Sequence, residues 1–407
     1  MTERLYYHDS FLHEFTARVQ KIIQRDGRSA VVLDRTAFYP TSGGQLFDIG
    51  TLAANSSILQ VSEVAEDESG AILHYIEAPD RVLEQAIEVV GKIDAERRRD
   101  HMQQHSGQHV LSAAFVRLFQ AATLSFHMGS ESCTIDVAAT NFASQQLERA
   151  EELANRVVTD DRPVEIRFAS SEEASAMGVR KLPTFETEGG KYRLIDIHEF
   201  DLTACGGTHV RRTGEIGAIL LRKIEKVKQG TRVEFVCGDR AVRTSRNDHN
   251  ALSQAAALYS THVWELPQQI RKSLDDIKAA HKAQQALLEE IAELHAARLL
   301  GEAERHKNAS VVVRVFPDRD AAFVKLLAQK IVRAKAAVAL VASTLAEPTL
   351  IFAQTPGLPF NMGALMKQAV AEMGGRGGGT KDFAQGGAAE ASRLAEVLAK
   401  LASELQV

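Results

Sequence analysis

Three histidines spaced four residues apart limit most strongly what this chain can fold into. They are His101, His105 and His109, in the segment HMQQHSGQH. This spacing places them on one face of a helix, where two neighbouring imidazoles lie near enough to bind the same metal ion. Zinc usually takes four nitrogen or sulfur ligands in a tetrahedron, so a helical pair needs two more ligands from elsewhere. The segment therefore predicts a helix that meets a second, distant pair of ligands.

That second pair occurs in ACGGTHV. Cys205 and His209 are four residues apart, and the two glycines between them permit a tight bend of the backbone. Together with His105 and His109 they predict a zinc site of three imidazoles and one thiolate. Two alternatives stay open from the spacing alone. The histidine pair can be a chance pair on a solvated helix, and a zinc with four protein ligands can be purely structural.

The composition indicates a soluble, multidomain protein of the cytoplasm. At 407 residues the chain is too long for one typical domain, and its 45% hydrophobic and 25% charged residues are ordinary for globular proteins. Three cysteines are too few for a disulfide framework, which favours a reducing compartment. The N-terminus has no apolar signal segment, and no apolar run is long enough to span a membrane. A net charge of −5 argues against a surface that is basic all over and binds nucleic acid through its charge.

Changes in residue composition and in the spacing of apolar residues divide the chain into four parts. Residues 1–92 carry short β-branched runs separated by turn signals, which predicts a β-rich domain. Residues 93–247 mix helices and short strands around the candidate ligands. Residues 248–308 are mostly helical in pattern, and residues 309–407 alternate strand and helix segments before and after GGRGGG.

The third part predicts one long helix from Leu266 to about His306. Pro267 suits its first turn, and apolar residues recur at helical spacing as far as Leu294. Such a seam with charged flanks suggests a long helix pair or a dimer contact. An amphipathic helix packed on its own chain is the alternative.

Several motifs, in order along the chain, resemble those of one family. HSGQHVLSAAF, followed by DLTACGGTHV, resembles the zinc-binding signature of the alanyl-tRNA synthetase editing domain and of its free-standing relatives, the AlaX proteins. RTAFYPTSGGQLFDIG resembles the glycine-rich motif of that family, and TLSFHMG and RVEFVCGDRA also fit its pattern. MGGRGGGTKDFAQGG resembles the C-terminal domain of the synthetase. The resemblance, closest to the long form of AlaX, runs from about residue 5 to the last residue.

The resemblance implies an α+β fold class with four parts. These are an N-terminal β-barrel-like domain with the glycine-rich motif (1–92), an α+β zinc-binding editing domain (93–247), a long helical connector (248–308) and a C-terminal α/β domain (309–407).

The resemblance also implies an ATP-independent, zinc-dependent hydrolase that deacylates mischarged tRNA(Ala), chiefly Ser-tRNA(Ala) and secondarily Gly-tRNA(Ala). The glycine-rich motif begins at Arg35, which leaves no room before it for an aminoacylation core. A pocket built for alanine rejects serine poorly, because one added hydroxyl costs little in binding, so a second hydrolytic site is needed. One zinc per chain would lower the pKa of a bound water or orient the substrate.

The glycine-rich motif supplies the candidate substrate contacts. Thr36 matches by position the threonine that the family places near the substrate, and Gln45 is a second polar candidate. Gly43 and Gly44 would let the backbone approach the aminoacyl end closely, with a plain hairpin turn as the alternative. Two further histidines are candidates for supporting the ligands rather than binding the metal: His101 and His127.

Recognition of the tRNA body should appear as positive charge. Between Arg211 and Arg246 there are ten Lys or Arg and four Asp or Glu, a net excess of +6. A solvated strand surface is the alternative reading of this band. The candidate tRNA contacts are Arg211, Arg212, Arg222, Lys223 and, in GGRGGG, Arg376.

Two other functions stay open. A tRNA-binding protein with a structural zinc and no deacylase activity is one, although retention of Thr36, Gln45 and all four ligands favours an enzyme. A threonyl-type editing domain is the other, because it shares the HxxxH and CxxxH layout; FYPTSGGQ favours the alanyl type. A DHH-type phosphoesterase is disfavoured, since no DHH triplet occurs. The expected partners are mischarged tRNA(Ala) and a second copy of the chain, with no membrane.

Overall fold

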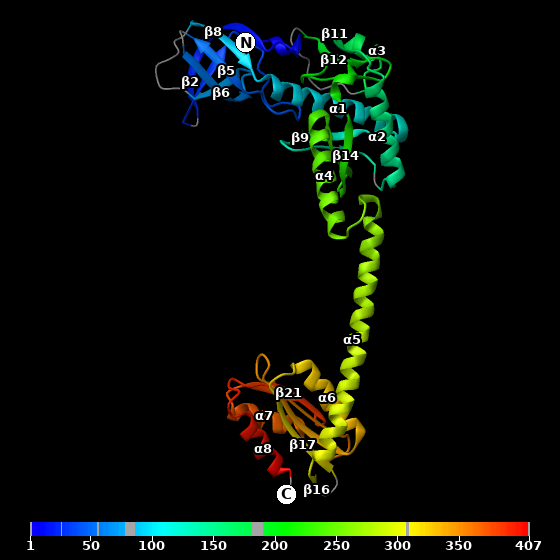
Figure 1. Ribbon diagram of the computed structural model, residues 1–407. Helices are drawn as coiled ribbons and strands as arrows, with labels where there is room; N and C mark the ends of the chain where they lie inside the picture. Colours follow the sequence, from blue (N-terminus) through cyan, green and yellow to red (C-terminus); the bar gives the residue numbers. More distant parts are fainter. Residues whose placement is uncertain are drawn as a thin grey trace. The chain divides into compact units, whose positions relative to one another are not determined.

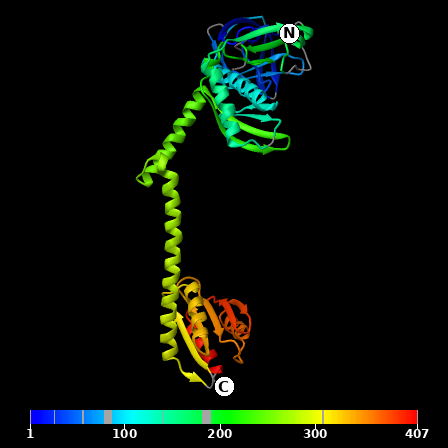
Figure 2. The ribbon, with the colours of Figure 1, turned by 90° about the vertical axis from the view of Figure 1, so that its right-hand side faces the viewer.

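The chain forms two compact units, Met1–Gln254 and Ala255–Val407, each drawn from two directions in Figures 1 and 2. The computed structural model describes residues 2–25, 27–54, 57–77, 86–139, 141–180, 190–306 and 309–405. The four-part division stays a prediction, and residue 308, where the predicted connector ends, lies outside the described residues.

A closed six-stranded barrel opens the first unit (blue to cyan in Figure 1). Its antiparallel strands follow the order β2-β3-β7-β6-β5-β8. Side chains alternate between buried and exposed along β8, as period-2 strands require when one face packs on a core. The predicted barrel is therefore confirmed. The strands are β2 (Glu14–Arg25), β3 (Arg28–Leu33), β5 (Gly50–Ala54), β6 (Ser57–Glu66), β7 (Ile72–Glu77) and β8 (Glu88–Ile93).

Before and beside the barrel, β1 (Glu3–Arg4) pairs in parallel with β4 (Arg35–Thr36), and a short 3-10 helix, η1 (Leu5–Tyr7), follows β1. This pairing holds the start of the glycine-rich segment against the N-terminal strand.

Helix α1 (Ala95–Phe119) leaves the barrel after β8 and carries the histidines (Figure 1). The side chain of Asp94 caps it by accepting hydrogen bonds from the backbone N–H groups of Glu96 and Arg97. The helix is buried on every face along its middle, polar residues included. A methyl group on Gly107 would overlap the sulfur of Cys237 on β15, so glycine there lets the sheet approach the helix.

Two antiparallel sheets complete the first unit, in the orders β14-β15-β10-β9 and β11-β12-β13. Apolar residues of α1 and α2 (Ser144–Thr159) form one core with them. The strands and the polar helix predicted between residues 134 and 180 are present. The remaining elements are β9 (Thr123–Met128), β10 (Cys133–Val137), β11 (Val164–Ala169), α3 (Ser171–Ala176), β12 (Tyr192–Ile197), β13 (Asp201–Ala204), η3 (Thr213–Ile216), β14 (Ile219–Val227) and β15 (Gly230–Cys237).

Three helical segments follow: α4 (Gly238–Leu258), η4 (Val263–Glu265) and α5 (Leu266–Glu302). The long helix predicted from Leu266 is present as α5, while its role as a connector stays a prediction. Near its C-terminus, Ala292, Ala296 and Leu299 are buried against α6 (Ala321–Ala334) and the sheet of the second unit. The rest exposes an apolar row of Ile270, Leu274, Ile277, Leu287, Ile291 and Leu294.

A six-stranded sheet, in the order β16-β17-β18-β19-β21-β20, forms the centre of the second unit. The end of α5 and α6 share one core with it, and α7 and α8 share the other. The elements are β16 (Arg305–His306), β17 (Ala309–Phe316), α6 (Ala321–Ala334), β18 (Ala337–Ser343), β19 (Thr349–Gln354), α7 (Met362–Glu372), β20 (Arg376–Gly379), β21 (Phe383–Gly387) and α8 (Leu394–Glu404).

Among the described strands of this sheet, the predicted alternation of strand and helix gives one parallel pair, β17 with β18. The other pairings between described strands of this sheet are antiparallel. Short turns join β18 to β19 and β20 to β21, as antiparallel neighbours allow. The sheet is therefore mixed. Part of the GGRGGG motif forms the edge strand β20.

Among the described helices, none is both long enough and apolar enough to cross a membrane. All three cysteines are free. The cytoplasmic location stays a prediction.

Candidate metal centre

Two segments a hundred residues apart bring four metal-binding side chains together. Helix α1 supplies His105 and His109, and the loop after β13 supplies Cys205 and His209. Their ligand atoms all lie within 4.8 Å of one another. Sγ of Cys205 lies 3.3 Å from Nε2 of His105 and 3.3 Å from Nε2 of His209. The four side chains paired from the sequence are thus neighbours and could hold one metal ion.

The donor set fits zinc. Zinc–nitrogen and zinc–sulfur bonds of about 2.0 and 2.3 Å put tetrahedral ligand atoms roughly 3.3–3.7 Å apart, close to the distances around Cys205. Burial lowers the pKa of His105 to about 3 and holds the pKa values of His109 and His209 well below their ordinary value. The imidazoles are therefore neutral and can offer a lone pair. Burial raises the pKa of the Cys205 thiol, so a metal that binds there displaces a proton.

Hydrogen bonds at Nδ1 orient two of the imidazole rings. Nδ1 of His105 lies 2.7 Å from Oε1 of Gln45, and Nδ1 of His209 lies 3.1 Å from Oγ of Ser106. An amide oxygen only accepts, so Nδ1 of His105 donates and its Nε2, facing Cys205, is unprotonated. This arrangement is typical of histidines that bind a metal.

Gln45 joins the glycine-rich loop to the loop of the second ligand pair. It is fully buried, and its Oε1 also accepts a hydrogen bond of 3.0 Å from the backbone N–H of Thr208. Its Nε2 donates to Oγ1 of Thr208 at 2.9 Å. The side chain therefore positions His105, a candidate metal ligand, and the loop of Thr208, while the predicted contact of Gln45 with substrate stays a prediction.

A cavity of about 500 Å³ adjoins the four ligands. This is large enough for a small ligand. His105, His109 and Cys205 form part of its wall, and Gly43 lines it from the glycine-rich loop. Among the described lining residues there is no Asp or Glu. The polar side chains that also line it are Tyr7, Tyr39, Ser42, Gln108, Thr123, Ser125, Arg180, Tyr192, Arg193 and Thr203.

Thr36 lies inside the barrel and is not part of the cavity wall. Its Oγ1 is fully buried, lies 2.8 Å from Nε2 of His74 and accepts a hydrogen bond from the backbone N–H of Phe38. Nδ1 of His74 lies 3.0 Å from the carbonyl oxygen of Val31 and must donate to it, so Nε2 accepts the proton of the Thr36 hydroxyl. The hydroxyl is fully engaged within the barrel, and its contact with substrate stays a prediction.

Three other candidate residues from the sequence, Gly44, His101 and His127, do not line the cavity. Gly44 is not among the lining residues; its φ is +87°, and a side chain there would meet the backbone oxygen of Phe126. His101 is buried one turn before the metal ligands, and its Nδ1 has no hydrogen-bond partner among the described residues. His127 is exposed on β9 and does not reach the cavity.

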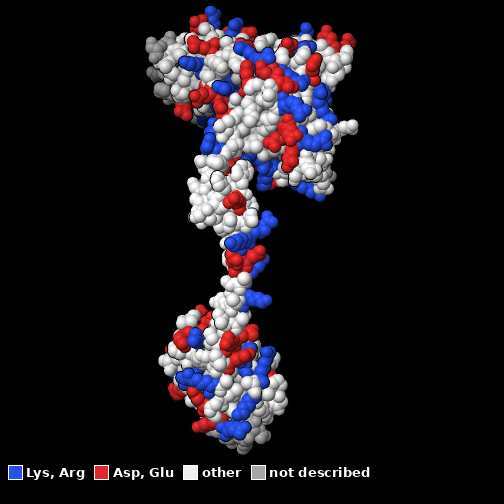
Figure 3. Space-filling model, turned by 45° about the vertical axis from the view of Figure 1, so that its right-hand side comes forward, with Lys and Arg blue, Asp and Glu red and all other residues white. Residues whose placement is uncertain are grey.

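Four of the five candidate tRNA contacts are in ion pairs. Arg376 is exposed on β20, and no ion pair involves it within the described chain. Lys and Arg are interspersed with Asp and Glu on the face drawn in Figure 3, so positive charge does not form one continuous patch there. The pairs are Arg211 with Asp9, Arg212 with Asp161, Arg222 with Asp248 and Lys223 with Glu225.

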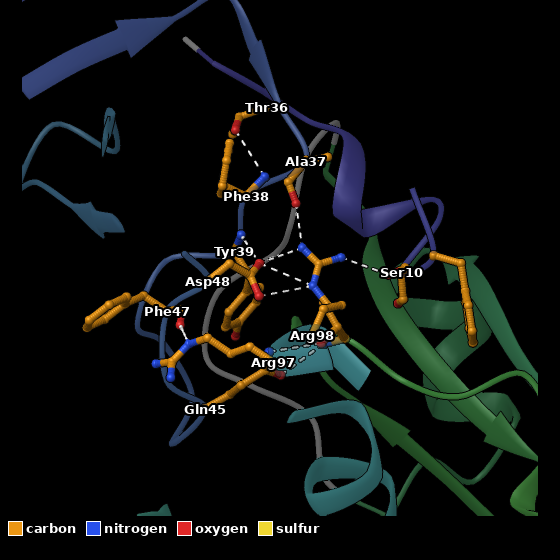
Figure 4. Close-up of polar contacts among 12 residues, drawn as sticks. Ser10, Thr36, Ala37, Phe38, Tyr39, Gln45, Phe47, Asp48, Arg97 and Arg98 are labelled. Carbon is orange, nitrogen blue, oxygen red and sulfur yellow. Dashed lines mark hydrogen bonds and ion pairs between the residues drawn. The ribbon is translucent and has the colours of Figure 1, made fainter. Parts of the chain in front are cut away.

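A buried ion pair fixes α1 against the glycine-rich loop (Figure 4). The side chains of Arg98 and Asp48 are fully buried and 2.5 Å apart. Asp48 also accepts a 2.7 Å hydrogen bond from the backbone N–H of Tyr39. The guanidinium donates to the carbonyl oxygens of Ser10 and Ala37 as well. These contacts hold the loop that carries Gln45 beside the helix that carries the histidines.

Comparison with known families matches three stretches of the chain. Residues 3–97 match the family described as tRNA synthetases class II (A). Residues 192–234 match the second additional domain of threonyl and alanyl tRNA synthetases, and residues 306–406 match the DHHA1 domain.

Single relatives are similar along nearly the whole chain. The alanyl-tRNA editing protein AlaX-L of Pyrococcus horikoshii is 33% identical over 414 residues, which cover 100% of both chains. The alanine–tRNA ligase of Pyrococcus abyssi is 30% identical over 404 residues, 98% of this chain and 43% of the ligase. The chain thus spans less than half of that ligase.

A solved structure, the C-Ala domain of Aquifex aeolicus alanyl-tRNA synthetase, is 20% identical over 26% of this chain and 96% of that domain. Its TM-score of 0.24 is too low to support a structural argument. The sequence matches carry the assignment instead: because a relative is matched from end to end and the three family matches follow in order, the chain belongs to the family of alanyl-tRNA editing proteins.

Proposed function

We propose that this protein hydrolyses the ester between a wrong amino acid and tRNA(Ala), chiefly serine and secondarily glycine, and that it does not aminoacylate tRNA. The observation that carries the proposal is the cluster of His105, His109, Cys205 and His209, with the three histidines buried and Cys205 partly exposed, beside a cavity of about 500 Å³. AlaX-L, similar over its full length, is named an alanyl-tRNA editing protein.

In this reaction water adds to the ester carbonyl, and the bond between the carbonyl carbon and the ribose oxygen breaks. The products are a free amino acid and a tRNA with a free terminal hydroxyl. His105, His109, Cys205 and His209 would hold one zinc ion, whose positive charge would orient the aminoacyl group or polarise its carbonyl. Gln45 and Ser106 keep two of the imidazole rings turned for that task.

The remaining cavity wall suits a small amino acid with a hydroxyl side chain that is attached to the negatively charged tRNA. Hydroxyl groups of Thr123, Ser125 and Thr203 can hydrogen-bond the side chain of serine. The guanidinium of Arg193 adds a buried positive charge to the same wall, which favours an anionic ligand, whereas the charge of Arg180 is paired with Asp201. Because no carboxylate lies among the described lining residues, a side-chain carboxylate base is not part of this proposal.

The tRNA body is expected to contact both units. Arg376 presents an exposed positive charge beside the glycine-rich edge of the C-terminal sheet. Arg211, Arg212 and Arg222 are paired with carboxylates, so their contact with phosphates requires exchange of these surface ion pairs. Such exchange costs little, because exposed pairs contribute at most about 1 kcal/mol.

A second copy of the chain is the expected partner of α5. Its apolar row includes Leu274 at 52% exposure, Leu287 at 59% and Leu294 at 65%, and a solvated helix seldom keeps such a row uncovered.

A deacylation assay tests the function. The zinc-loaded protein should release serine from Ser-tRNA(Ala) faster than alanine from Ala-tRNA(Ala), with Gly-tRNA(Ala) measured alongside. A His105→Ala/His109→Ala double variant is the control and should lose both zinc and activity. No charging of tRNA(Ala) with alanine should occur on addition of ATP. A zinc-loaded protein that binds tRNA(Ala) and deacylates none of the three would favour the tRNA-binding alternative.

A further inference from the structure

The third imidazole of the cluster differs from the other two. Nδ1 of His109 is buried and has no hydrogen-bond partner among the described residues. Oδ2 of Asp201 lies 3.9 Å from it, about 1 Å longer than a usual hydrogen bond. Histidines that bind a metal almost always donate their other N–H to a carboxylate, a carbonyl oxygen or a water. The position of Asp201 therefore matches the partner that His109 lacks.

Asp201 is held in place by a second residue, Arg180. The carboxylate is nearly inaccessible, with its side chain 3% exposed. Nε of Arg180 donates to Oδ1 at 2.7 Å and Nη2 donates to Oδ2 at 2.8 Å, a two-pronged contact that fixes the plane of the carboxylate. The backbone N–H of Arg180 also donates to the carbonyl oxygen of Leu202, which ties it to β13.

We propose that Asp201, held by Arg180, accepts a hydrogen bond from Nδ1 of His109 and so positions this ring with Nε2 toward the metal. The inference rests on the zinc site of the proposed function. A side-chain shift of about 1 Å brings the two atoms to hydrogen-bond length. Each imidazole then has a partner from a different element: Gln45 in the glycine-rich loop, Ser106 in α1 and Asp201 in β13.

The pair also connects the metal site to the cavity. Arg180 lines the cavity wall, while Asp201 begins the strand that leads to Cys205. Arg180 and Asp201 are thus positioning residues, because they act on the metal through His109 and the strand rather than by binding it.

Zinc affinity of the full-length protein, measured by competition with a chelator, tests this assignment. Asp201→Ala should weaken zinc binding about 10- to 100-fold, the usual effect of removing a partner of a metal-binding histidine. Arg180→Ala should weaken it in the same direction, and Arg180→Lys should restore part of the loss. The matched control is Asp196→Ala on the neighbouring strand, which breaks a similar pair with Arg167 at 2.7 Å and should leave zinc affinity unchanged.

A cobalt-loaded sample reports the geometry of the ligands. Asp201→Ala should shift the visible absorption bands of bound cobalt, while Asp196→Ala should keep the spectrum of the unaltered protein. If Asp201→Ala does not fold, as judged by circular dichroism of the metal-free protein, Asp201→Asn decides the question in the same two assays. Unchanged zinc affinity and an unchanged cobalt spectrum would overturn the inference. No tRNA enters these assays, so an inactive protein with intact zinc binding refutes the proposed function alone.

Discussion

At the scale of single residues, the hydroxyl of Thr36 has a structural task inside the barrel. Replacing it in Thr36→Val leaves Nε2 of His74 and the N–H of Phe38 without a buried partner. We expect a loss of about 1–2 kcal/mol in the free energy of unfolding, measured by urea titration. Thr134→Val is the control, because Thr134 lies partly exposed on a strand, and it should change stability by less than about 0.5 kcal/mol.

The same variant separates the two roles considered for Thr36. A hydroxyl that contacts the substrate would also make Ser-tRNA(Ala) hydrolysis slower relative to Ala-tRNA(Ala). Lower stability with unchanged selectivity would restrict Thr36 to the barrel.

We expect His74 to make the barrel sensitive to acid. Burial lowers its pKa to about 4, below the ordinary 6.5. The unfolded chain therefore takes up a proton before the folded one, so stability is complete above pH 6.5 and falls as the pH drops toward 4. His74→Gln keeps one donor and one acceptor but cannot be protonated. Between pH 7 and pH 5 the variant should lose about 2 kcal/mol less stability than the unaltered protein, as measured by urea unfolding at both pH values. An equal loss in both proteins would show that His74 is not the acid-sensitive group.

At the scale of elements, the loop after β13 has two glycines with different surroundings. A methyl group on Gly207 would overlap the ring of His105 and the amide of Gln45, whereas one on Gly206 would reach only ordinary contact, 3.6 Å, with Tyr7. Gly207→Ala should therefore weaken zinc binding at least tenfold, and the matched Gly206→Ala should bind zinc normally. Chelator competition measures both. Equal affinities in the two variants would mean that the loop adapts to the added methyl.

The buried pair of Arg98 and Asp48 joins helix α1 to the glycine-rich loop. Arg98→Met should cost about 3–5 kcal/mol of stability, because Asp48 is left charged and buried. The exposed pair of Arg28 and Glu63 is the control, and Arg28→Met should cost at most about 1 kcal/mol. Thermal or urea unfolding measures both. In Arg98→Met/Asp48→Asn the loss should be smaller than in Arg98→Met, since no unpaired charge remains.

At the scale of the whole molecule, the metal cluster and its cavity lie entirely within the first unit. A fragment that ends after Leu258, the last residue of α4, should fold, bind one zinc and hydrolyse Ser-tRNA(Ala) with little change in kcat. Its KM should rise, because tRNA contacts of the second unit are lost. Light scattering should show a monomer, since the apolar row of α5 is absent. An unchanged KM would show that the second unit does not hold the tRNA, and a zinc-loaded fragment without activity would show that the second unit completes the site.

The sequence by itself paired the four candidate metal ligands and predicted many of the elements. A spacing of four residues can be recognised in the sequence, because a helix or a tight bend at glycine places both side chains on the same side of the backbone. His105, His109, Cys205 and His209 could therefore be paired from the sequence alone, and the long helix α5 was predicted from the period of its apolar residues.

Only the tertiary structure decided which polar residues support that ligand set. Arg98 stands between Arg97 and Arg99 in the sequence, and nothing local distinguishes the one that is fully buried. Asp201 and Arg180 become partners only through the packing of a strand against a distant segment, and Thr36 is enclosed only because the barrel closes around it. Burial and hydrogen-bond pairing depend on contacts between residues far apart in the chain, and a local pattern carries no information about those contacts.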